Sequence, residues 1–170
     1  MITFQTVTSI DDAEFDSLYE ASSYYMDRSN YPYYLHGLAD PDARRQHIRS
    51  EFDRWLSDGV VWRVSDGDLA LGLSGGEISN NKLIWYQSLV GPNAEGSRSY
   101  LYDDSYIAAR NTMLTSLGVN GWVVEITGEG NSMHEYYNRL QEQGKLGSSV
   151  SQETTEEGSG LTVVRITVTI

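Results

Sequence analysis

The chain has 170 residues, which fits one domain with a single core, and its formal net charge is −12 because 24 acidic residues face 12 basic ones. This charge disfavours nucleic acid, whose binding depends largely on phosphate neutralisation. Cysteine is absent, which excludes disulfides and cysteine-bound zinc. No apolar run is long enough to span a bilayer, and the N-terminus does not resemble a signal peptide. We therefore expect a single domain over residues 1–170 that is not secreted and binds neither membrane nor nucleic acid.

The N-terminal third predicts one strand followed by two helices. Residues 2–8 alternate apolar and polar side chains, as a strand does. A helix is expected from about 11 to 22, and a loop over 27–37. Asp40-Pro41 is an N-cap followed by proline at the first helical position, and Gly59 is a helix stop. Between them lies a stripe with helical spacing, formed by Ile48, Phe52, Trp55 and Leu56.

The central stretch predicts an antiparallel meander that leads into a βαβα unit. Strands over 60–65, 69–73 and 82–90 are joined by turns at 66–68 and 79–81, with a bulge or bend at Gly75-Gly76. A helix over 104–117, a strand over 121–127 and a helix over 132–140 follow. Strands 82–90 and 121–127 should be parallel neighbours. A turn at 156–160 and a strand over 161–170 close a final hairpin. The class is α+β, with a mixed sheet of about seven strands and about four helices.

This order of elements resembles the GNAT N-acyltransferase superfamily over nearly the whole chain. Local similarities are Leu69-Ala-Leu-Gly72, the strand that ends at Val90, and Tyr137-Asn-Arg-Leu140 in the last helix. The resemblance implies that the strand ending at Val90 receives the pantetheine of an acyl-CoA. It also implies that Tyr137 acts as general acid. In the family, the strands that correspond to 82–90 and 121–127 diverge at their carboxyl ends to form the cofactor cleft, whereas a gap filled by the side chains of 91–103 would exclude a cofactor.

The loop after Val90 departs from the family. The family has Arg/Gln-x-x-Gly-x-Gly/Ala there, whose backbone N–H groups hold a pyrophosphate. The glycines of residues 91–104 are Gly91 and Gly96, and their spacing does not match the motif. Asp103 and Asp104 bring negative charge to the start of the next helix. Gly130 stands where the family has an asparagine.

From this departure we expect a non-catalytic protein that binds no cofactor. It would be a structural or protein-binding component in the cytoplasm or in a virion, similar to acyltransferase-like bacteriophage virion proteins. A protein partner or assembly is therefore expected. The candidate contact residues are the tyrosines of two segments: Tyr24, Tyr25, Tyr31, Tyr33, Tyr34, Tyr100 and Tyr102.

The alternative hypothesis is an N-acetyltransferase that uses acetyl-CoA. Tyr137 would be its general acid, the strand edge at Val90 would hold the pantetheine, and Arg98 would contact the phosphates. In either case we expect the loop 91–103 to be ordered by its own aromatic residues. We also expect Asp103 or Asp104 to cap the following helix with its side chain.

Other chemistry-bearing residues predict no further site. His36, His47 and His134 lie in different elements without metal-ligand spacing, so no metal is expected. Glu125 lies within the strand 121–127 and admits two interpretations. It is either a general base with a raised pKa or a strand residue bonded to solvent.

Overall fold

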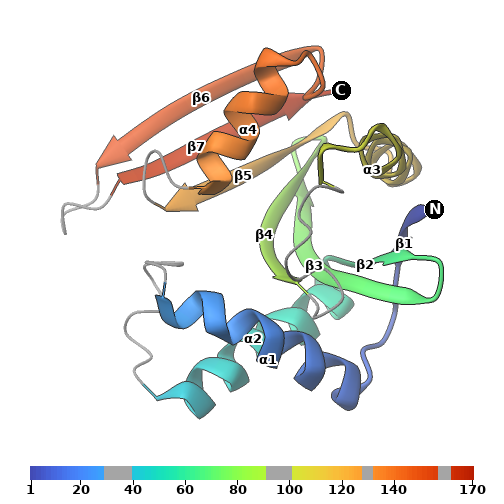
Figure 1. The fold of residues 1–170 in the computed structure, drawn as a ribbon, viewed down its shortest axis with the longest axis vertical. Coiled ribbons are helices and arrows are strands. Elements are labelled where there is room, and N and C mark those ends of the chain that lie inside the picture. Colours follow the sequence, from blue (N-terminus) through green and yellow to red (C-terminus); the bar gives the residue numbers. More distant parts are fainter. Residues whose placement is uncertain (29–39, 91–100, 128–131, 157–161) are drawn as a thin grey trace.

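In a computed structural model of the chain, residues 1–28, 40–90, 101–127, 132–156 and 162–170 are described. Among these residues, seven strands form one mixed sheet and four helices pack on it (Figure 1). The strands are β1 (Ile2–Thr6), β2 (Val60–Asp66), β3 (Leu69–Ser79), β4 (Lys82–Val90), β5 (Gly121–Thr127), β6 (Ser149–Glu156) and β7 (Thr162–Thr169). The helices are α1 (Asp12–Arg28), α2 (Pro41–Asp58), α3 (Asp104–Ser116) and α4 (Ser132–Glu142). The predicted α+β class is confirmed.

The strand order is β1-β2-β3-β4-β5-β7-β6. Strands β2 to β4 form the predicted antiparallel meander, and β4 and β5 are the predicted parallel neighbours. Strand β1 extends the meander by pairing antiparallel with β2. The final hairpin inserts β7 between β5 and β6, antiparallel to both. The parallel pair in the middle therefore joins two antiparallel halves of the sheet.

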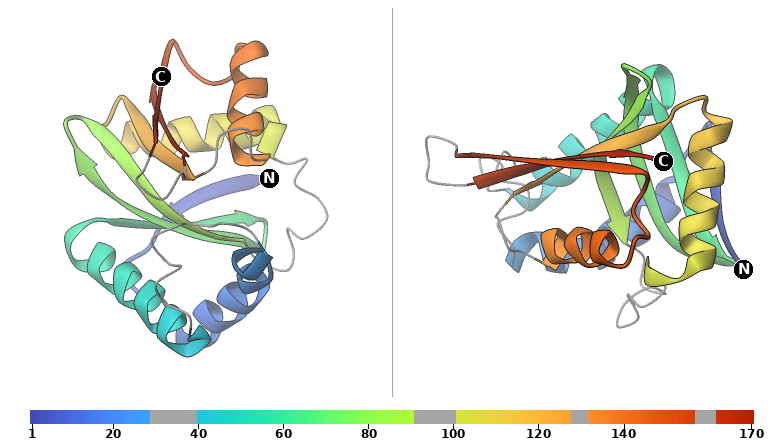
Figure 2. Two further views of the ribbon diagram at one scale, coloured as in Figure 1. Left: turned by 90° about the vertical axis from the view of Figure 1, so that its left-hand side faces the viewer. Right: turned by 90° about the horizontal axis from the view of Figure 1, so that it is seen from above.

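The helices cover opposite faces of the sheet, so the molecule has two hydrophobic cores (Figure 2). Helices α1 and α2 pack on one face of β2 to β4, and their core includes Phe15, Leu18, Ile48, Phe52, Trp55, Val61 and Leu73. Helices α3 and α4 pack on the other face, and their core includes Trp62, Leu83, Met113, Leu114, Trp122, Tyr137, Leu140, Val164 and Ile166.

Both predicted signals that bound α2 are confirmed. Asp40 is the N-cap, its side chain accepts a hydrogen bond from the Asp42 N–H at 3.3 Å, and Pro41 follows it. At the other end the Gly59 N–H donates to the Trp55 carbonyl at 2.8 Å. The buried stripe of α2 contains Ile48, Phe52 and Trp55, as its spacing predicts.

Helix α1 is longer than the predicted 11–22, because it extends to Arg28. The predicted loop at 27–37 therefore begins too early. The physical reason is that residues 23–28 contain neither glycine nor proline, so nothing in their backbone stops the helix. Helix α4 likewise continues to Glu142 and not only to Leu140.

Turn residues with positive φ account for the sharp reversals. Gly67 has φ 57° between β2 and β3, and Asn80 and Asn81 have φ 50° and 61° between β3 and β4. Two successive positive φ angles are the requirement of a two-residue hairpin turn, which asparagine tolerates. Gly118 has φ 73° after α3, and the Val119 N–H donates to the Leu114 carbonyl at 3.2 Å, as at a glycine-terminated helix end.

Candidate functional site

Strands β4 and β5 pair over only three residues and then diverge. Their register joins Leu83–Trp85 to Trp122–Val124, whereas β4 continues to Val90 and β5 to Thr127. Figure 1 shows β5 turning away from β4 toward the C-terminal hairpin. The divergence at the carboxyl ends, which the resemblance implied, is therefore present.

A β-bulge lies at the point of divergence. In the β3–β4 register Gly76 faces Trp85 and Gly75 faces Gln87, so Tyr86 is an extra residue in β4. A bulge bends the strand that carries it and increases its twist, which turns β4 away from β5. A Cβ on Gly76 would lie 2.0 Å from the Ile84 carbonyl oxygen. Glycine at position 76 is therefore needed for the close approach of β3 and β4.

From Tyr86 to Val90, β4 pairs with β3 alone among the described strands. The opposite edge of this segment can form main-chain hydrogen bonds with an extended ligand that carries amide groups, as sheet edges do. Val90, the residue named for pantetheine binding, ends this edge opposite Gly72. Its side chain lies outside the described part of the chain.

Tyr137, the predicted general acid, is on α4 and is only 5% exposed. The indole N–H of Trp122 on β5 donates a hydrogen bond to the Tyr137 hydroxyl oxygen at 3.3 Å. Burial raises the pKa of Tyr137, while the Trp122 hydrogen bond and the nearby Arg110 charge act in the opposite direction. A buried phenol with a raised pKa keeps its proton at neutral pH, which suits an acid.

Two residues of this site were missed by the sequence analysis, Arg110 and Trp122. Arg110 on α3 is 2% exposed, and its guanidinium carbon lies 4.2 Å from the centre of the Trp122 ring. Burial lowers the pKa of Arg110. The signal in the sequence was an arginine within an otherwise apolar stripe at i, i+4, i+7 and i+8, formed by Tyr106, Arg110, Met113 and Leu114.

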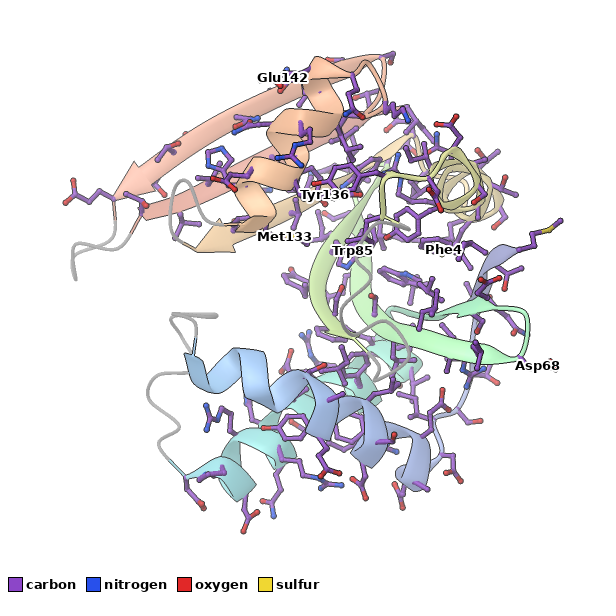
Figure 3. All side chains as sticks on the ribbon, viewed as in Figure 1. Phe4, Asp68, Trp85, Met133, Tyr136 and Glu142 are labelled. Atoms are coloured by element: carbon purple, nitrogen blue, oxygen red, sulfur yellow. The ribbon has the colours of Figure 1, made fainter. Side chains whose placement is uncertain are left out.

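The C-terminal end of the 91–103 loop docks on α4. The Tyr136 hydroxyl donates to the Leu101 carbonyl at 3.0 Å, and the Tyr102 and Tyr136 rings meet edge to face at 5.1 Å. Figure 3 shows Tyr136 on the side of α4 that faces α3. Aromatic packing therefore orders Leu101 and Tyr102 against their own chain. Residues 91–100, with Arg98 and Tyr100, lie outside the described residues.

The predicted side-chain cap of α3 is wrong. Asp103 is at the N-cap position, but its carboxylate forms no capping hydrogen bond. Asp104 instead forms an ion pair with Lys145 at 2.9 Å. The reason is that Lys145, just after α4, brings a cation close to the start of α3 and attracts the neighbouring carboxylate.

Of the remaining sequence candidates, the structure describes the side chains of Glu125, His47 and His134. Glu125 is exposed and pairs with Arg165 of β7 at 2.8 Å, so its interpretation as a buried general base is wrong. Tyr24 and Tyr25 are in α1, but their side chains, like Tyr31, Tyr33, Tyr34 and His36, lie outside the described part. His134 bonds to Gln152 at 3.0 Å.

The described residues contain neither a candidate metal-binding cluster nor a candidate membrane-spanning helix. No group of three or more histidine or carboxylate side chains in those parts of the chain could hold a metal ion. None of their helices is both long and apolar enough to cross a membrane.

No family model matches the chain, and no curated protein is detectably similar in sequence. Solved structures do resemble it. A chimera of the spermidine N-acetyltransferase SpeG from Vibrio cholerae and hSSAT has a TM-score of 0.62 at 14% identity, and the match covers 99% of this chain and 95% of the chimera. The PaiA N-acetyltransferase from Thermoplasma acidophilum in complex with coenzyme A has a TM-score of 0.58 at 10% identity, and the match covers 100% of this chain and 99% of that protein. The ribosomal-protein-S18-alanine N-acetyltransferase from Escherichia coli has a TM-score of 0.57 at 11% identity, and the match covers 100% of this chain and 94% of that protein.

These comparisons confirm the expected GNAT-like fold and correct the expected function. The hypothesis of a non-catalytic virion component is wrong, because the three structures named above, each of which matches 99% or more of this chain, are N-acetyltransferases. That hypothesis depended on the motif glycines that are missing from the loop after Val90. The divergence of β4 and β5 depends on the bulge at Tyr86, which the departures in the loop leave intact.

Proposed function

We propose that this chain is an N-acetyltransferase that transfers the acetyl group of acetyl-CoA to an amine. The observation that carries the proposal is the divergence of β4 and β5 beside a buried tyrosine. The edge of β4 from Tyr86 to Val90 pairs with no strand on the β5 side among the described residues, and Tyr137 is held against β5 at Trp122. The GNAT-like fold, shared with N-acetyltransferases in complex with coenzyme A, supports it.

The residues present fit acetyl-CoA in two respects. The β4 edge offers main-chain groups to the amides of the pantetheine arm, and the bulge keeps β5 from occupying that edge. The start of α3 is not closed by a carboxylate cap, so the Asp103 side chain does not occupy its N–H groups. Arg98 is our candidate for a charge-assisted contact to the phosphates, in place of the missing glycines.

Tyr137 donates its hydroxyl proton to the sulfur that leaves. The amine nitrogen attacks the thioester carbonyl, the carbon–sulfur bond breaks, and an S–H bond forms as the Tyr137 O–H bond breaks. The amine loses a proton to water, and Tyr137 regains one from water. Burial favours the neutral phenol, so the Tyr137 hydroxyl is protonated at the start of each cycle.

Turnover assays test the proposal. The purified chain is mixed with acetyl-CoA and a panel of amines, including a polyamine and peptides with a free N-terminus, and the release of free thiol is measured. We expect turnover with at least one amine, and a loss of kcat of about 100-fold or more in Tyr137→Phe, the range for removal of a general acid. Tyr19→Phe, in the core between α1 and α2, is the control. Equal kcat in Tyr137→Phe and the parent chain contradicts the assignment.

A further inference from the structure

Three buried side chains from three elements form a continuous chain of contacts. The Arg110 guanidinium of α3 lies over the face of Trp122 on β5, at 4.2 Å from the ring centre. The Trp122 indole N–H points to the hydroxyl oxygen of Tyr137 on α4, at 3.3 Å. Their exposed fractions are 2%, 0% and 5%. The three residues are therefore largely shielded from water and act on one another at low effective dielectric, and Tyr137 keeps the largest exposed fraction of the three.

The chemistry of the indole group determines where the Tyr137 proton lies. An indole N–H can only donate, so in this hydrogen bond the Tyr137 oxygen is the acceptor. The hydroxyl proton must then point away from Trp122. No acceptor for that proton is found among the described residues. The arrangement thus leaves the proton available to an acceptor that is not part of the described protein.

Arg110 is a buried cation without a carboxylate partner in the described parts of the chain. Its Nε and Nη2 atoms donate to the amide oxygen of Asn111 at 3.2 and 3.1 Å, and its flat face rests on Trp122. Burial of a charge that lacks an opposite charge is unfavourable. Such a cation is best stabilised when a negative charge develops nearby, and the phenolate that Tyr137 forms on losing its proton is such a charge.

We propose that Arg110 and Trp122 are positioning residues for Tyr137, with Trp122 orienting the hydroxyl proton and Arg110 stabilising the phenolate. This rests on the proposed function, in which the proton passes to a departing sulfur. Because the interaction with Arg110 is stronger after the proton has left than before, it lowers the barrier and not merely the energy of the resting state. The hydroxyl proton is the only atom that Tyr137 itself gives up, and the phenolate takes its replacement from water.

Other titratable groups near the cluster are tyrosines, from α3 and α4. Tyr106 of α3 and Tyr136 of α4 act electrostatically on Arg110, and the Tyr136 ring lies 5.3 Å from the Tyr137 ring. At neutral pH Arg110 is thus the charged group that acts on Tyr137 among the described residues. Its removal should raise the pKa of Tyr137, and so should removal of the indole N–H.

Nuclear magnetic resonance of chains labelled with ¹³C at the tyrosine Cζ tests this without any need for turnover. Tyr137→Phe assigns the Tyr137 signal, and the signal is followed as pH rises. We expect the titration midpoint to move upward by about one pH unit, equivalent to a tenfold change in acidity, in Arg110→Met. Trp122→Phe should move it in the same direction. Arg110→Lys, which keeps the positive charge, should bring the midpoint most of the way back to that of the parent chain.

Trp62→Phe is the matched control, because Trp62 is equally buried but its indole N–H has no hydrogen-bond partner among the described residues. It should leave the Tyr137 midpoint unchanged. In turnover assays Arg110→Met should lower kcat about tenfold without changing KM for acetyl-CoA, and should move the alkaline limb of the kcat profile upward. The midpoint shift without turnover on any amine would support the cluster and count against the proposed function. Identical midpoints in Arg110→Met and the parent chain would overturn the inference, whatever the turnover.

Discussion

At the scale of single residues, the two faces of the sheet differ in how an arginine that faces the interior is paired: Arg63 is partly buried, whereas Arg110 is buried. Between α1 and β2, Arg63 donates two hydrogen bonds to Glu14, at 2.6 and 2.8 Å, and the Glu14 hydrogen bond raises the pKa of Arg63. On the other face Arg110 has an aromatic ring and an amide oxygen in place of a carboxylate. The Arg63–Glu14 ion pair links β2 to α1. Arg110, in contrast, places a positive charge without a carboxylate partner among the described residues near Tyr137.

A residue-scale prediction concerns the alkaline stability that depends on Tyr137. Burial raises its folded pKa above the value of about 10 for an unfolded tyrosine, so the folded state holds the proton more tightly. Its contribution to stability is therefore complete below pH 10 and is lost as pH rises through the folded pKa. Above pH 10, the free energy of unfolding should fall faster in the parent chain than in Tyr137→Phe, by up to about 1.4 kcal/mol per pH unit.

Urea unfolding at a series of pH values from 8 to 11 measures this difference. Lys82, whose pKa is lowered by burial, is present in both chains, so its contribution cancels. Parallel curves for the two chains across this range would show that Tyr137 titrates as it does in the unfolded state.

At the scale of elements, two helix starts with the same residue type at the N-cap differ in their local contacts. Asp40 caps α2 with its side chain, and the ring of Pro41 presets the first turn. Asp103 occupies the same position at α3 without a side-chain hydrogen bond. The negative charge of each aspartate still interacts favourably with the positive end of the helix dipole. The start of α3 is thus held by packing of Leu101 and Tyr102 on α4 more than by its cap.

We predict that this difference is measurable by substitution of each aspartate. Asp40→Ala should lower the free energy of unfolding by about 1 kcal/mol, the usual effect of losing a capping hydrogen bond. Asp103→Ala should lower it by less, about 0.3–0.5 kcal/mol, because only the interaction with the helix dipole is lost. Chemical unfolding of the two variants side by side provides the measurement. A larger loss for Asp103→Ala would mean that its carboxylate does cap α3.

At the scale of the whole molecule, the divergence of β4 and β5 divides the sheet into two halves, and the core under α3 and α4 extends across both of them. Three residue pairs join the halves within the sheet. Helices α3 and α4 span the junction, since their core contains Trp62 of β2, Leu83 of β4 and Val164 of β7. A ligand that bridges β4 and β5 would therefore add contacts between the halves and stabilise the folded chain.

We predict that acetyl-CoA raises the melting temperature. At a ligand concentration about 100-fold above Kd, the stabilisation is about 2.7 kcal/mol, which corresponds to an increase of roughly 5–11 °C for a chain of this size. Differential scanning calorimetry measures the shift. Arg98→Ala should reduce it if Arg98 contacts the phosphates, whereas Arg165→Ala, on β7 and paired with Glu125, serves as the control. The same melting temperature with and without millimolar acetyl-CoA would contradict the proposed function.

The sequence alone was sufficient to predict most elements and their order, because the signals are local. Strands β4 and β5 begin and end as predicted, and Asp40 and Gly59 mark α2. Periodicity and turn chemistry act within a few residues, so they can be read without knowing what packs against them. The end of α1 was missed because no local stop signal precedes Arg28.

The candidate site depended on contacts between elements distant in sequence, which local patterns do not specify. Tyr137 was named from its similarity to a family motif, but Arg110 and Trp122 gain their importance only when α3 and β5 pack together. The missing loop glycines suggested a lost function. The place where β4 leaves β5, however, is decided by a bulge opposite Gly75 and Gly76. The length of a strand is a local property, but how far it stays hydrogen-bonded to the adjacent strand is determined by the register of the whole sheet.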